Sequence, residues 1–122
     1  MTKTIIRAGV VAVGLFVTST SSAAHHGGAS FDTSREITLK GTVTEWIWAN
    51  PHCFLKIDAK DETGTVRNWN LEFGNPTDIT LRGFRRNSFK VGEEITVTVT
   101  PVKSGAPVGR ARVVTKADGT KL

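Results

Sequence analysis

The sequence predicts an all-β fold with one short helix, arranged as a five-stranded OB-like Greek-key barrel. Five segments have the apolar patterning of strands, a helix signal falls between the third and the fourth, and turn residues separate the segments. Three strands, a helix and two strands, in that order, is the connectivity of the OB-fold. An open sandwich of immunoglobulin type is the alternative, but it needs about seven strands.

The first three strands are expected to form a meander. The first strand covers residues 36–48, where apolar and polar residues alternate, and it ends at the turn signal Asn50-Pro51. The second strand covers residues 52–59, and the third covers residues 65–73. Gly64, in the loop between these two strands, suits the positive φ angle of a hairpin turn.

The helix is expected over residues 76–84. Asn75 is a good N-cap, and Pro76 suits the first helical position because the N–H that it lacks would have no partner there. Two further apolar segments, residues 95–102 and 109–115, supply the fourth and fifth strands.

The amino-terminal segment has the pattern of a secretory signal peptide. Lys3 and Arg7 precede an apolar run over residues 8–17, and small residues lead to a cut after Ala23 or after Ala24. The run is too short to span a bilayer as a helix, which takes about 20 residues. We therefore expect a protein of the periplasm or the extracellular space, with no membrane span once the signal is removed.

We divide the chain into a signal peptide (1–24), a flexible amino-terminal segment (25–35) and the OB-like barrel domain (36–122). The formal net charge of +5 includes Lys3 and Arg7, which leave with the signal peptide. The mild positive charge that remains is ordinary for a soluble protein, so nucleic acid is not expected as a partner.

No catalytic residues are assigned. The sequence lacks the Gly-x-Ser-x-Gly of a nucleophile elbow, the His-Glu-x-x-His metal motif, a phosphate-binding loop and a dinucleotide fingerprint. These absences favour a binding or accessory module over an enzyme.

Candidate ligand-binding residues gather on the outer face of the first three strands and on the loop after the first. If the alternation persists, they form one surface made of Trp46, Trp48, Asn50, His52, Phe54 and Asn70. OB-folds bind ligands on this face and on the loops beside it, so an unidentified small molecule or an envelope protein would bind there. A bulge near Glu45 would instead turn both tryptophans into the core, and the sequence leaves the two arrangements open.

The three histidines support a second hypothesis, a Cu(II) site. A cut after Ala24 would make His25 the first residue, so its amine and imidazole could chelate Cu(II), with His26 or His52 completing a tetragonal site. A cut after Ala23 would place His26 third. The amine, two deprotonated amides and that imidazole could then surround the ion in a square plane.

Cys53 is the only cysteine, so no disulfide can form within the chain. It shares a strand face with Leu55 and Ile57, and we interpret it as a small buried hydrophobe rather than as a metal ligand.

The mature chain also resembles a small exported bacterial family of unknown function. The segments that carry the likeness are Ala24-His25-His26, Gly41-Thr42-Val43-Thr44, Trp48-Ala49-Asn50-Pro51-His52, Trp69-Asn70-Leu71-Glu72, Gly74-Asn75-Pro76, Leu81-Arg82-Gly83-Phe84, Val91-Gly92-Glu93 and Ala111-Arg112-Val113-Val114. The resemblance covers nearly the whole mature chain and keeps the order of the segments. It implies a secreted or periplasmic OB-like barrel, and it supplies no reaction.

The chain departs from this family at two places. Members commonly have Ser or Ala soon after the two histidines, where Gly27-Gly28 stands here and would loosen a metal site. Members typically have an apolar residue in place of Cys53, which fits a buried thiol. Three functions follow as hypotheses: a binding or accessory module, a copper-binding protein, and a protein–protein adaptor in an envelope assembly.

Overall fold

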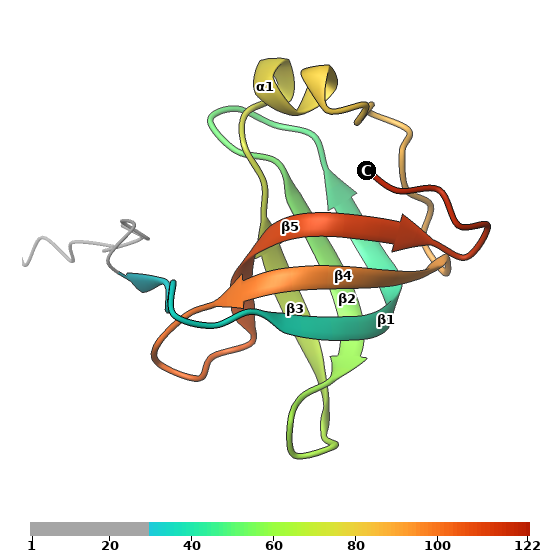
Figure 1. Cartoon of the computed structure of the whole chain (residues 1–122). Coiled ribbons are helices and arrows are strands. Elements are labelled where there is room, and N and C mark those ends of the chain that lie inside the picture. Colours follow the sequence, from blue (N-terminus) through green and yellow to red (C-terminus); the bar gives the residue numbers. More distant parts are fainter. Residues whose placement is uncertain (1–29) are drawn as a thin grey trace, which may run out of the picture.

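The computed structural model describes residues 30–122, in which five strands close into a barrel with a short helix at one end (Figure 1). The elements are β1 (Ile37–Ile47), β2 (Phe54–Lys60), β3 (Val66–Glu72), α1 (Pro76–Leu81), β4 (Glu94–Pro101) and β5 (Val108–Lys116). The expected signal peptide, residues 1–24, and the histidines at positions 25 and 26 lie outside the described residues, so these expectations stay predictions.

The predicted fold class is confirmed, with five barrel strands and one short helix between the third and the fourth. The helix is shorter than predicted, because it ends at Leu81 instead of reaching residue 84. Gly83 has a φ angle of 97°, in the left-handed region, so the helix cannot continue through this position.

Closure of the barrel depends on one parallel strand pair. The neighbours β1–β2, β1–β4, β2–β3 and β4–β5 are all antiparallel. The remaining edges, β3 and β5, pair in parallel, with Asn70 opposite Val108 and Glu72 opposite Arg110. Figure 1 shows β4 and β5 crossing over β2 and β3 at a large angle. The strand edges that could pair with other chains are therefore used within the barrel.

The core fills the barrel with the inward side chains of all five strands. The residues that are fully or almost fully buried inside include Val43, Leu55, Ile57, Leu71, Val97, Val99 and Val114. Ile79 of α1 and the rings of Phe84 and Phe89 extend this core at the helix end. Cys53 is 0% exposed and belongs to the same cluster, which confirms its predicted burial.

The helix α1 begins at the predicted cap. The Asn75 side chain accepts a hydrogen bond of 2.9 Å from the backbone N–H of Asp78, and its amide donates to the Asp78 carboxylate at 2.7 Å. The helix buries Ile79 against the barrel. Within residues 30–122, no helix combines the length and the apolar character that crossing a membrane requires.

A bulge interrupts β1 in its second half. Val43 lies opposite Ile57, but the next paired residue, Glu45, lies opposite Lys56, so Thr44 is one residue in excess over β2. Because strand side chains alternate with a period of two, the extra residue exchanges the two faces of β1 beyond it.

The hairpin between β2 and β3 is held by Asp61. Its carboxylate accepts hydrogen bonds from the hydroxyl of Thr63 at 2.6 Å and from the backbone N–H groups of Thr63 and Thr65. These bonds, the hydroxyl first, lower the pKa of Asp61, and its contact with Arg67 acts in the same direction. Gly64 has the predicted positive φ, at 84°.

Part of the segment expected to be flexible, residues 25–35, packs on the barrel. The Phe31 side chain is 2% exposed, and its backbone forms a bridge to Val102. The N–H of Asp32 donates to the carbonyl of Pro101 at 2.8 Å. The chain is thus anchored on the barrel before β1 begins.

Gly41 allows β1 and β2 to approach closely, and we predict that Gly41→Ala is destabilising. A Cβ atom at this position would lie 2.5 Å from the backbone oxygen of Asp58 and 2.8 Å from the Cβ atom of Ala59. The expected loss in the free energy of unfolding is about 1–3 kcal/mol, as for an overpacked core. Urea denaturation measures it. Gly74→Ala is the control, because its nearest neighbour, Ile79, is 3.4 Å away. Equal effects of the two substitutions would contradict the steric explanation.

Candidate binding site at the His52 face

A histidine, a buried carboxylate and an arginine meet on the outer face of the barrel. The Nδ1 atom of His52 lies 3.1 Å from Oε1 of Glu72, and an Nη atom of Arg110 lies 3.8 Å from the same oxygen. The Glu72 side chain is 8% exposed, whereas those of His52 and Arg110 are 46% and 41% exposed. One buried carboxylate therefore contacts two half-exposed nitrogen groups. We refer to these three side chains as the His52 cluster.

Three different chain segments assemble the His52 cluster. Glu72 is the last residue of β3, where it lies opposite Phe54 of β2 on one side and Arg110 of β5 on the other. Backbone hydrogen bonds of Cys53 continue the β2–β3 pairing beyond Glu72. This pairing holds His52, the preceding residue, beside the end of β3.

The contact with Glu72 fixes which imidazole nitrogen of His52 is free. Nδ1 faces the Glu72 carboxylate at 3.1 Å, and a carboxylate can only accept hydrogen bonds. In the neutral tautomer that carries its proton on Nδ1, Nε2 keeps its lone pair. Half of the side chain is exposed, so this nitrogen can receive a ligand or a metal ion.

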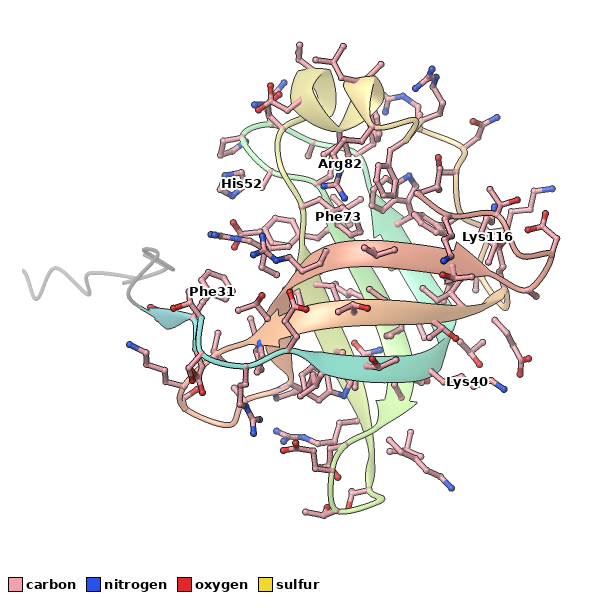
Figure 2. All side chains as sticks on the ribbon, viewed as in Figure 1. Phe31, Lys40, His52, Phe73, Arg82 and Lys116 are labelled. Carbon is pink, nitrogen blue, oxygen red and sulfur yellow. The ribbon has the colours of Figure 1, made fainter. Side chains whose placement is uncertain are left out.

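Arg110 connects the His52 cluster to the first described residues of the chain. The centre of its guanidinium lies 4.4 Å from the centroid of the Phe31 ring, the geometry of a cation–π contact. Figure 2 shows Phe31 and His52 on the same side of the barrel. The contacts thus run without interruption from Phe31 through Arg110 and Glu72 to His52.

The remaining residues of the predicted surface lie around the His52 cluster. Phe54 is half-buried opposite Glu72, and Asn50 is exposed in the loop between β1 and β2. The side-chain oxygen of Asn70 is buried and has no hydrogen-bond partner among residues 30–122. A donor from water or from a bound molecule would satisfy this oxygen.

The loop between β4 and β5 lies beside β3, as OB-fold binding predicts. The Arg67 guanidinium donates to the carbonyl of Gly105 at 3.0 Å, and the N–H of Asn70 donates to the carbonyl of Pro107 at 2.9 Å. The loop between β4 and β5 therefore borders β3.

The alternation that placed Trp46 on the outer face is wrong, because the bulge at Thr44 exchanges the faces of β1. Trp46 packs against the core, and its ring centroid lies 5.5 Å from that of Phe73 and 5.0 Å from that of Phe89. Its indole N–H donates to the carbonyl of Arg85 at 3.1 Å. Trp46 is therefore a partly buried core residue and not an exposed platform.

Trp48 follows Trp46 onto the helix end of the barrel. Its ring makes an edge contact with Trp46 at 5.9 Å between centroids, and it too is partly buried against the core. The structure thus takes the second of the two arrangements that the sequence left open, in which both tryptophans pack against the core.

The described residues contain no complete metal site. No group of three or more His, Cys, Asp or Glu side chains within residues 30–122 could hold a metal ion. The Cys53 thiol is buried, and its sulfur lies 3.7 Å from the carbonyl of Ala49. His25 and His26 lie outside the described residues, so the metal hypothesis has His52 as its one candidate ligand in this part of the chain.

The sequence analysis assigned neither Glu72 nor Arg110 to the site. Alternation within β3 gives the direction of Glu72 but not its burial or its two partners. Arg110 reaches the site through the parallel β3–β5 pairing, which is a long-range contact. The one available signal was the OB-like connectivity, which requires these two strands to meet.

Comparison with known proteins identifies a family but no characterised relative. The model of DUF6152, described as a family of unknown function, matches residues 12–111. No curated protein and no solved structure matches the chain.

The aromatic contacts of Trp46 predict that Trp46→Ala is strongly destabilising. Removing the indole from the cluster with Phe73 and Phe89 should lower the free energy of unfolding by about 3 kcal/mol, near the lower end for buried aromatic residues. Phe54→Ala, the matched control on the outer face, should cost about 1 kcal/mol because that ring does not pack against the core cluster. Urea denaturation compares the two. A larger loss for Phe54→Ala would contradict the assignment of Trp46 to the core.

Proposed function

The chain belongs to DUF6152, a family of unknown function, and from the geometry of its own residues we propose that it is an exported binding module that holds Cu(II) through His52. The observation that carries this proposal is the 3.1 Å contact between Nδ1 of His52 and the buried carboxylate of Glu72. Export is proposed on the charged, apolar and small-residue pattern of residues 1–24.

The contact with Glu72 is the arrangement that supports metal ligation by histidine. Metal-binding histidines almost always donate their second ring N–H to a carboxylate, a carbonyl or water, which fixes the ring and raises its basicity. The buried Glu72 carboxylate is placed to accept this N–H, and the Nε2 atom of His52 is left to ligate the metal ion. The burial of Glu72 also keeps its carboxylate from rotating away into solvent.

The further ligands are proposed to come from the start of the mature chain. The protein has three histidines, and the two besides His52 are His25 and His26. The chain is anchored at Phe31, which is linked to His52 by the contacts of Arg110 and Glu72. The six residues from His25 to Ser30 can span at most about 20 Å, the reach that the proposal uses to bring His25 and His26 to His52.

Copper is the metal that this set of donors favours. An amino-terminal amine and imidazoles form an all-nitrogen set, and tetragonal nitrogen ligation is typical of Cu(II). A thiolate, which would favour zinc or Cu(I), is not offered by the buried Cys53. Cu(II) also has the highest affinity among the divalent first-row metals for a given site.

The test is a Cu(II) titration of protein that begins at His25, with electron paramagnetic resonance as the structural readout. We predict that His52→Ala lowers the affinity at least about tenfold and changes the spectrum, because one imidazole is lost. Glu72→Ala should lower the affinity by about 10–100-fold, the range for the loss of a carboxylate behind a metal-bound histidine. Lys56→Ala, on the same outer face, is the control and should leave both readouts unchanged.

A second form of the protein, beginning at Ala24, separates this site from simple chelation by the chain terminus. In that form His26 stands third, and the amine, two amides and its imidazole can bind Cu(II) without His52. We therefore expect His52→Ala to have no effect there. The proposal would be refuted if, in the form beginning at His25, the His52→Ala variant bound Cu(II) with the same affinity as the parent protein.

A further inference from the structure

The end of the barrel that carries α1 presents one prominent leucine and three arginines. Leu81 is 86% exposed, and the segment that follows it contains the exposed residues Arg82, Arg85 and Arg86. Figure 1 shows α1 as the outermost element at this end of the molecule, opposite the β2–β3 hairpin. We call these four residues the Leu81 patch.

The exposure of Leu81 follows from the way α1 packs. Ile79 is 1% exposed and faces the barrel. Leu81 is two residues further along, which turns it by about 200° around the helix axis and directs it away from the core. Burial of a leucine side chain stabilises a folded protein. Leu81 faces outward, so it does not contribute this stabilisation to the barrel.

The arginines of the Leu81 patch lack acidic partners. Within residues 30–122, ion pairs form at Arg35, Arg67, Arg110 and Arg112, but none forms at the three arginines of the patch. Arg82 instead donates to the carbonyl of Arg112 at 2.7 Å, and Arg85 donates to the carbonyls of Thr80 and Phe84. These bonds to neutral groups fix two guanidinium groups and leave the positive charge uncompensated.

We propose that the Leu81 patch docks the protein on an anionic phospholipid surface, with Leu81 inserted among the headgroups and the arginines on lipid phosphates. Cations next to a membrane are attracted to its negative surface potential, and an apolar side chain adds partitioning into the interface. The patch projects from the end of the barrel, so a flat surface can reach it without contacting the strands. A protein interface would instead need a wide apolar core, and the patch offers a single leucine.

The experiment measures co-sedimentation of the protein with lipid vesicles. Vesicles of phosphatidylcholine mixed equally with phosphatidylglycerol should bind the protein, and vesicles of phosphatidylcholine alone should not. Raising the salt concentration should release it, because the attraction is screened. Absence of binding to the mixed vesicles at low salt overturns the proposal.

Two variants test the patch itself. Arg86→Glu should lower vesicle binding by roughly tenfold or more, through reversal of one charge near the surface. Leu81→Ser should lower binding by roughly tenfold at constant charge, through loss of the inserted side chain. Both residues are exposed, so the midpoint of urea unfolding should stay unchanged and should show that the variants fold.

Lys40→Glu is the matched control for charge, because Lys40 is exposed on β1, well away from α1 (Figure 2). It should weaken binding much less than Arg86→Glu. Equal losses for these two variants would show a response to net charge alone and would overturn the proposal. The proposal would also be overturned if the protein bound polyglutamate in a Leu81-dependent way but did not bind vesicles. That result would indicate an acidic protein as the partner.

Discussion

The parallel contact between β3 and β5 is the constraint on which the rest of the structure depends. It is short, running from Asn70 opposite Val108 to Glu72 opposite Arg110, yet it turns an open sheet into a barrel. Gly109 lies in the middle of it, where a Cβ atom would collide with the side chain of Val99. A small residue at this position therefore allows β5 to lie close to β4 while it reaches β3. Closure also removes free strand edges, a common source of aggregation.

The same contact creates the candidate site. Glu72 is buried where β3 ends, and a buried carboxylate is costly unless nitrogen donors satisfy it. Arg110 arrives from β5 through the parallel pairing, and His52 arrives from the loop before β2. Both donors stay half-exposed, so the buried charge is balanced by groups that can also contact a ligand. The contacts that surround the Glu72 carboxylate and those that orient His52 are thus one arrangement.

The bulge in β1 determines how the side chains pack at the helix end of the barrel. By exchanging the faces of the strand at Thr44, it brings Trp46 against Phe73 and Phe89 and lets the indole hold the carbonyl of Arg85. The segment after α1 is therefore tied to β1. This tie positions the arginines that follow Leu81 on the outer end of the molecule, while the aromatic rings fill its interior.

The sequence by itself determined the order of the elements, the turns and the helix cap, because these depend on local patterns such as alternation and Asn75-Pro76. It also determined the burial of Cys53, which shares a strand face with apolar neighbours. The tertiary structure alone decided which way Trp46 faces, since one extra residue in β1 reverses every side chain after it and leaves no local signal. The tertiary structure alone brought Arg110 to Glu72 and His52. Their contact requires β3 and β5 to pair when the barrel closes, and this pairing is set by packing between distant segments rather than by the local sequence of either strand.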